Sequence, residues 1–184
     1  HVTDRRQRQM CIRDRPIYCG TEDKHAYVVP YNGLRLSCTI DFDHPLIGQQ
    51  SIDVDVNEKS FSQELASART FGFMKDIEKL REMGLALGAS LENAIALNKD
   101  SLVNPEGLRF DNEFVRHKAM DALGDLMTLG RPIMGHVVLY KAGHDLLNQL
   151  VRKILDSPQS YQDLVLGGAM PEYETFEIPF SGRA

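Results

Sequence analysis

The chain contains no tryptophan, only three cysteines and no long run of apolar residues. No segment approaches the roughly 18 consecutive apolar residues of a membrane-crossing helix, and no secretory signal peptide is visible. Cys11, Cys19 and Cys38 lack the spacing of a cysteine metal site, and so few cysteines suit a reducing compartment. The net charge of −5 gives no general attraction to nucleic acid. We therefore expect a cytoplasmic globular domain, since 184 residues can bury a substantial core.

The first fifteen residues, HVTDRRQRQMCIRDR, differ from the rest because they carry five arginines and no apolar periodicity. Taken alone they could be a basic arm for nucleic acid. However, RRQRQMCIRD followed by Arg15 is what one reading frame of a DNA adapter used in short-read sequencing encodes. We therefore predict that residues 1–15 are translated adapter, disordered and without function, and that nucleic acid is not a partner. Without them the net charge falls from −5 to −8, and the natural protein would extend upstream of Pro16.

Residues 25–56 show the patterns of antiparallel strands. Asn32-Gly33 is typical of a two-residue hairpin turn, and apolar and polar residues alternate from Leu34 to Phe42 after it. The segment SIDVDV repeats this alternation. We therefore predict three antiparallel strands, with Cys38 on the face that packs into the core.

Helical periodicity appears in four later segments, at about 58–67, 74–84, 111–129 and 146–155. The long third helix is expected to stop at Gly130, and the strand IMGHVVLYKAGH precedes the last helix. A small strand insert is expected at about 85–104, and a loose tail from about Ser157. Strands followed by helices predict an α+β fold for residues 16–184, a two-layer sandwich in which a mostly antiparallel sheet packs against helices.

The long helix carries a polar row on an otherwise largely apolar surface. His117, Asp121 and Asp125 follow one another at intervals of four residues, opposite an apolar stripe. An imidazole and a carboxylate at this spacing can reach one metal ion, so His117 and Asp121 are candidate zinc ligands. The alternative is an ordinary ion pair without a metal. Catalytic zinc normally has three protein ligands, so two would make an incomplete site.

His144 is a second candidate for chemistry. It follows a strand and a glycine and opens a helix, which is a common way to place a side chain at a cleft. Asp125 is a possible carboxylate partner for it. The alternative is a capping or structural histidine, which is the role that we expect for His25, His44 and His136.

Three segments together resemble a known family. ARTFGF (68–73), NPEGLRFDNEFVRHKAMDALGDL (104–126) and YKAGH (140–144) resemble the zinc-dependent UDP-3-O-acyl-N-acetylglucosamine deacetylases of lipid A biosynthesis. The resemblance runs through nearly all of residues 24–155, and only to the second of that family's two domains. It implies a two-layer α/β sandwich whose helices pack between two sheets.

The resemblance also implies catalytic roles. His117 and Asp121 would be two of three zinc ligands, and Asp125 would orient and stabilise His144 as a cationic acid. Thr70 would help to hold the oxyanion. Zinc would polarise the acetamide carbonyl and acidify a bound water.

Other residues would hold the substrate. The resemblance implies that Lys118 contacts the phosphates of the nucleotide sugar. It also implies that Phe71, Met74 and Ile77, with the insert at 85–96, line a passage for the acyl chain. The spacing of these apolar residues suits an ordinary helix core as well.

One part of the family's pattern is missing. The third zinc ligand and the carboxylate that activates water form a Glu-His pair in the family's first domain, and these 184 residues contain no Glu-His dipeptide. We therefore predict a C-terminal fragment that binds zinc weakly and is inactive without the N-terminal domain. The alternative is a short, metal-free module that binds the acyl chain and the nucleotide sugar.

Overall fold

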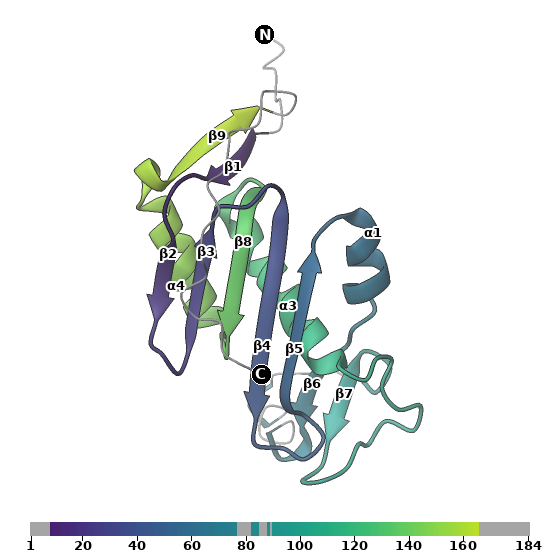
Figure 1. Cartoon of the computed structure of the whole chain (residues 1–184). Coiled ribbons are helices and arrows are strands. Elements are labelled where there is room, and N and C mark those ends of the chain that lie inside the picture. The colour runs from purple at the N-terminus through teal and green to yellow at the C-terminus, as the bar shows by residue number, and fades with distance from the viewer. Residues whose placement is uncertain (1–7, 77–81, 85–87, 89, 166–184) are drawn as a thin grey trace.

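The computed structural model describes residues 8–76, 82–84, 88 and 90–165. They form a seven-stranded sheet, two long helices packed on one face of it, and a separate two-stranded sheet (Figure 1). Most strand pairs of the large sheet are antiparallel. The predicted α+β class, a sheet packed against helices, is confirmed.

The large sheet contains β1 (Arg8–Ile12), β2 (Ile17–Gly20), β3 (His25–Val29), β4 (Leu34–Phe42), β5 (Gly48–Asp55), β8 (Ile133–Tyr140) and β9 (Tyr161–Val165). The small sheet pairs β6 (Thr70–Phe73) with β7 (Ala94–Leu97) in parallel. The helical elements are α1 (Glu58–Ser60), η1 (Phe61–Leu65), α3 (Glu113–Leu126), η2 (Met127–Leu129), α4 (His144–Leu155) and η3 (Pro158–Ser160).

Three of the four predicted helices are therefore confirmed, and the long one ends at Gly130 in the left-handed conformation with φ 75°. Of the helix expected at 74–84, residues 74–76 and 82 are helical, whereas residues 77–81 lie outside the described part of the chain. The strand insert expected at 85–104 contributes β7. No described helix has the length and apolar character that crossing a membrane requires.

The predicted hairpin at Asn32-Gly33 is wrong, because β8 lies between the two strands that this turn connects. β3 pairs antiparallel with β8, and β4 pairs parallel with the other edge of β8. The turn crosses the start of β8, where the Gly33 carbonyl accepts a 2.8 Å hydrogen bond from the N–H of Gly135. The Asn-Gly signal reports a local conformation, and it carries no information about a strand a hundred residues away.

Gly135 marks the tightest point of this crossing. A methyl group there would lie 2.8 Å from Val28 Cγ2 and 3.1 Å from the Val29 carbonyl oxygen. Gly135→Ala is therefore expected to lower the free energy of unfolding by about 1–3 kcal/mol through overpacking. Urea unfolding of the whole chain measures this.

Gly124→Ala is the matched control, because Gly124 is an exposed residue of α3 and a methyl group there meets nothing within 4 Å. It should raise the free energy of unfolding by about 0.5–1 kcal/mol through helix propensity. Equal effects of the two substitutions would contradict the close approach at Gly135.

Two segments expected to be loose instead pair with each other. β1 lies beside β8 in parallel and β9 in antiparallel register, and the side chains of Met10, Cys11 and Ile12 are fully buried. The predicted disorder of residues 8–12 is therefore wrong, since the apolar run Met-Cys-Ile can serve as a strand whatever its origin. The predicted loose tail is also wrong as far as β9, whereas residues 1–7 and 166–184 lie outside the described part.

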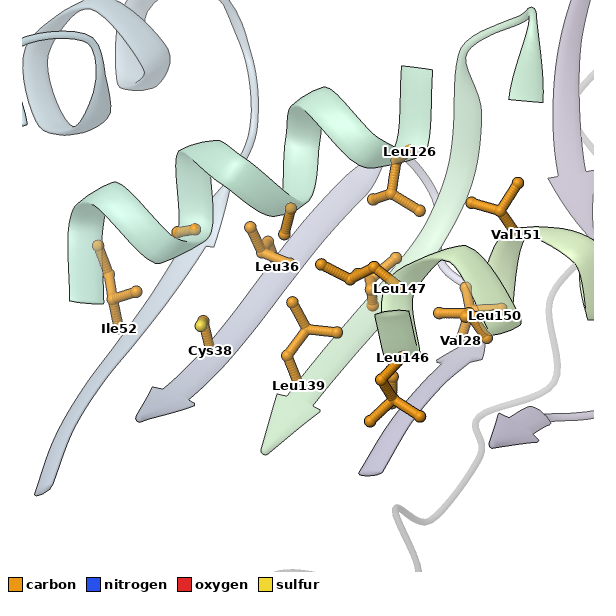
Figure 2. Packing of buried hydrophobic residues seen from close by; sticks show 14 of the residues in the cluster. Val28, Leu36, Cys38, Ile52, Leu126, Leu139, Leu146, Leu147, Leu150 and Val151 are labelled. Atoms are coloured by element: carbon orange, nitrogen blue, oxygen red, sulfur yellow. The ribbon is translucent and has the colours of Figure 1, made fainter. Parts of the chain in front are cut away.

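The core lies between the helices and the large sheet (Figure 2). Leucines of α4 and Leu126 of α3 meet side chains of β3, β4 and β8, among them Val28, Leu36 and Leu139. Cys38 lies in this layer and is 3% exposed, as predicted. Burial raises the pKa of its thiol to about 12, so Cys38 is an inert core residue.

Candidate active site

Helix α3 presents one face to the sheet and a polar row away from it. On the side that faces the sheet, Val115, Ala119, Ala122 and Leu126 are buried. His117, Asp121 and Asp125 lie on the opposite side, yet their side chains are only 12%, 20% and 20% exposed. The row is therefore shielded from most of the solvent although it does not belong to the core.

His117 is held by a backbone carbonyl on one side and faces a carboxylate on the other. Its Nδ1 lies 3.2 Å from the Ala68 carbonyl oxygen, and its Nε2 lies 3.1 Å from Asp121 Oδ1. A carbonyl only accepts hydrogen bonds, so in a neutral ring the proton sits on Nδ1. The lone pair of Nε2 then points at a carboxylate oxygen. Two acceptors at this distance need a proton or a cation between them.

The donor set fits a zinc ion as half of a site. Two ligands that are each about 2.0–2.1 Å from zinc at the tetrahedral angle lie about 3.3 Å apart, close to the observed Nε2–Oδ1 separation. Burial alone would raise the pKa of Asp121, but a hydrogen bond from His117 when its ring is doubly protonated and one from Lys118 lower it to about 2, so the carboxylate is ionised as a ligand must be. Across the described part of the chain, no three His, Cys, Asp or Glu side chains converge on one point.

Asp125 and His144 form a second polar pair one turn further along α3. The Nδ1 of His144 lies 2.7 Å from Asp125 Oδ2, so Nδ1–H donates to the carboxylate and Nε2 points elsewhere. His144 opens α4 after the extended residue Gly143, and its side chain is 61% exposed. The ring can therefore exchange a proton with a ligand at Nε2 while the carboxylate holds its orientation.

The remaining predicted site residues differ in how they lie relative to the polar row of α3. Thr70 is exposed at the start of β6, two residues after Ala68. The Lys118 Nζ lies 2.8 Å from Asp121 Oδ2, so it is tied to the candidate ligand in this state. Phe71 packs edge-on against Phe114 at 5.1 Å between ring centroids, which supports the core role that was left open for it.

Part of the expected acyl passage is not described. Met74 is half-buried in a helical segment at 74–76, and Ile77 lies outside the described residues. Much of the beginning of the insert, residues 85–87 and 89, lies outside them as well. The passage therefore stays a prediction.

The other three histidines are structural, as predicted. His44 Nε2 lies 2.8 Å from the Asn98 carbonyl oxygen, and His136 Nε2 lies 2.7 Å from Ser37 Oγ. His25 is 8% exposed and stacks on Tyr140. Local groups of the fold account for the positions of all three rings.

Sequence reasoning missed a buried ion pair next to the polar row. The side chains of Arg69 and Glu113 are 1% and 0% exposed, and they are joined by hydrogen bonds at 2.9 and 3.1 Å. Glu113 directly precedes the buried Phe114 and Val115, which was the one available hint. The partner lies 44 residues away, so local periodicity could not have found it.

An apolar groove of about 410 Å³ opens beside α3, away from the polar row. Phe61, Met120, Leu123 and Met127 line it, and Met127 is 64% exposed. A soluble monomer normally covers such side chains, so the groove suits contact with a further layer of protein.

The profile of the family described as LpxC, UDP-3-O-acyl N-acetylglycosamine deacetylase, matches residues 1–156. The chain belongs to this deacetylase family. A UDP-3-O-acyl-N-acetylglucosamine deacetylase of Bdellovibrio bacteriovorus is 62% identical over 160 residues, which cover 87% of this chain and 53% of the relative. Proteins of the same name from Myxococcus xanthus and Syntrophotalea carbinolica are 49% and 43% identical over 88% and 91% of the chain. The chain thus spans about half the length of these curated family members.

Proposed function

We propose that this chain is the second domain of a zinc-dependent deacetylase that hydrolyses the acetamide of UDP-3-O-acyl-N-acetylglucosamine in the cytoplasm, as a step of lipid A synthesis. The observation that carries the proposal is the facing pair of acceptors at His117 and Asp121. Their separation and the fixed tautomer of His117 suit a zinc ion shared between them. Family membership supplies the substrate.

The residues of this chain would divide the work as follows. His117 and Asp121 would hold the metal, which when bound would polarise the acetamide carbonyl and acidify a water molecule. His144, oriented by Asp125, would stabilise the oxyanion and then protonate the leaving amine from Nε2. The Thr70 hydroxyl would donate a further hydrogen bond to the oxyanion.

Substrate binding would rearrange one contact. Lys118 is the proposed partner of the substrate's phosphates, and its Nζ now lies on Asp121 Oδ2. A dianionic diphosphate would compete with a single carboxylate for the ammonium group. A metal ion on Asp121 would weaken the present contact further.

We also propose that a first domain, upstream of this chain in the natural protein, completes the site. It would supply a Glu-His pair as general base and third ligand, and it would cover the groove at Met120 and Met127. The length of the relatives supports this proposal, since they are about twice as long as the matching region. This chain alone would then bind zinc weakly and lack turnover.

The alternative is a metal-free module that binds the acyl chain and the nucleotide sugar. One observation favours it: the described residues provide no convergent third ligand. A module of this kind would bind substrate with the same affinity in the presence of zinc and in the presence of a chelator.

The decisive experiment compares two proteins. One is the chain itself. The other is a chimera in which the first half of the Bdellovibrio bacteriovorus relative precedes residues 16–184. We expect weak zinc binding and no turnover from the chain, and stoichiometric zinc with turnover from the chimera. The chimera with His117→Ala should lose both properties.

Two outcomes would contradict the proposal. Stoichiometric zinc and full turnover from the chain alone would refute the idea of an incomplete site. A folded chimera that binds the substrate equally well with and without zinc, and never hydrolyses it, would establish the binding module instead.

A further inference from the structure

The buried pair of Arg69 and Glu113 joins two segments of the site. Glu113 Oε1 accepts hydrogen bonds from both the side-chain Nε and the backbone N–H of Arg69, each at 2.9 Å. Its Oε2 accepts from the guanidinium at 3.1 Å and from the backbone N–H of Arg109 at 2.6 Å. The Glu113 carboxylate therefore fixes the main chain at Arg69 and at Arg109, and it also fixes the side chain of Arg69.

The position of the pair matters more than its charge. Arg69 lies between Ala68, whose carbonyl faces His117 Nδ1, and Thr70. Glu113 lies one helical turn before His117 on the same helix, α3. The pair thus fixes segment 68–70, which leads into β6, against the turn of the helix that carries the candidate ligand.

The same guanidinium also reaches the segment that directly follows the insert. Arg69 donates to Glu106 and, at 2.7 Å, to the Gly107 carbonyl. The side chain of Asn104, a residue only 4% exposed, donates to Glu106 and to the Ala94 carbonyl. The start of β7 is therefore tied through Asn104 and Glu106 to the pair that holds residues 68–70.

Stability alone does not account for such a pair. Removing two charges from water costs about as much as their attraction returns, and apolar pairs of similar volume are often at least as stable. What an apolar pair cannot do is accept hydrogen bonds from two backbone N–H groups and so set the main-chain position.

We propose that Arg69 and Glu113 are positioning residues that hold the Ala68 carbonyl on His117 Nδ1 and thereby present the Nε2 lone pair towards Asp121 for metal binding. The part of this inference that concerns the metal rests on the proposed function. The part that concerns the histidine tautomer does not. A carbonyl or carboxylate behind a ligating imidazole commonly changes metal affinity by 10–100-fold.

The test uses the whole chain with the double substitution Arg69→Met and Glu113→Leu, which removes the hydrogen bonds without leaving an unpaired buried charge. Imidazole ¹⁵N shifts of His117 report its tautomer, and a zinc titration followed on the same signals reports affinity. We expect a ring protonated at Nδ1 in the parent chain and a tautomer mixture in the variant. Zinc affinity should fall at least about tenfold.

The matched control is Arg35→Met with Asp53→Leu. This pair has the same two-point geometry, at 2.8 and 3.0 Å, but belongs to β4 and β5 on the face of the sheet that the helices do not cover. It should leave the tautomer of His117 and the zinc affinity unchanged. Loss of both properties in the control would mean that the effect is a general loss of structure, and it would overturn the proposal.

An unchanged His117 tautomer in a folded double variant would also overturn the proposal. If that variant fails to fold, Glu113→Gln replaces it, because an amide keeps one acceptor oxygen and loses the charge. A smaller tautomer shift in the same direction supports the proposal, and no shift refutes it. If zinc binds neither the parent chain nor the chimera, the proposed function fails while the tautomer result still stands.

Discussion

In the chimera described above, His144→Ala should lower kcat by about 10²–10⁴-fold, the range for loss of a general acid. The amine is a poor leaving group until it is protonated, and Nε2 of His144 is the proposed donor. The zinc content should not change, because His144 is on α4 and is not one of the proposed ligands. The limb of the pH–rate profile that reports the acid should disappear with the imidazole.

Asp125→Asn should produce a smaller loss of kcat with the same zinc content. An amide can still accept a hydrogen bond from Nδ1–H, but it cannot offset the charge of an imidazolium. The matched control is Asp145→Asn, since Asp145 is an exposed carboxylate adjacent to His144 in α4. Equal losses at the two positions, or loss of zinc with His144→Ala, would contradict these assignments.

Arg69→Met alone should lower the free energy of unfolding of the chain by about 3–5 kcal/mol, the typical cost of leaving a buried charge without its partner. The side chain of Glu113 is fully buried, so water cannot replace the lost hydrogen bonds. The double variant that also carries Glu113→Leu should recover most of this loss. Urea denaturation measures both, and a double variant no more stable than Arg69→Met would contradict the explanation.

The same pair should contribute to acid unfolding. Burial alone would raise the pKa of Glu113, but hydrogen bonds from Arg69 and from backbone N–H groups lower it below the ordinary value. A carboxyl with a lowered pKa stabilises the folded chain above its unfolded pKa, and this stabilisation is lost as the pH falls. The parent chain should therefore lose stability below about pH 4.5, more steeply than the double variant, because its carboxyl is ionised in the fold.

Local signals predicted the helix that carries the site. The four-residue spacing of its polar row, the apolar stripe and Gly130 are all read within a few turns, and each was found where expected. The pairing of Asp125 with His144 was also predicted, and the two lie 2.7 Å apart. The residues alone made Asp125 one possible carboxylate partner of His144, and the resemblance to the deacetylases assigned it that role.

Long-range pairing could not be predicted in this way. The hairpin failed because the sequence between β3 and β4 does not reveal that β8 separates them. The strands at Arg8–Ile12 and Tyr161–Val165 pair with each other, although they lie at opposite ends of the described chain. The partner of Glu113 is likewise distant. In each case the interaction joins residues that are far apart in sequence, and the local sequence around one partner does not identify the other.

The central place of β8 also has a consequence for how the chain folds. β3 and β4 share no hydrogen bonds, so neither gains a neighbour on its inner edge until residues 133–140 have been synthesised. Contacts between segments this far apart in sequence form slowly, because the entropy cost of closing a long loop comes before the favourable free energy of the contacts. During synthesis on the ribosome, the inner edges of β3 and β4 would therefore remain unpaired and accessible to chaperones until β8 is made.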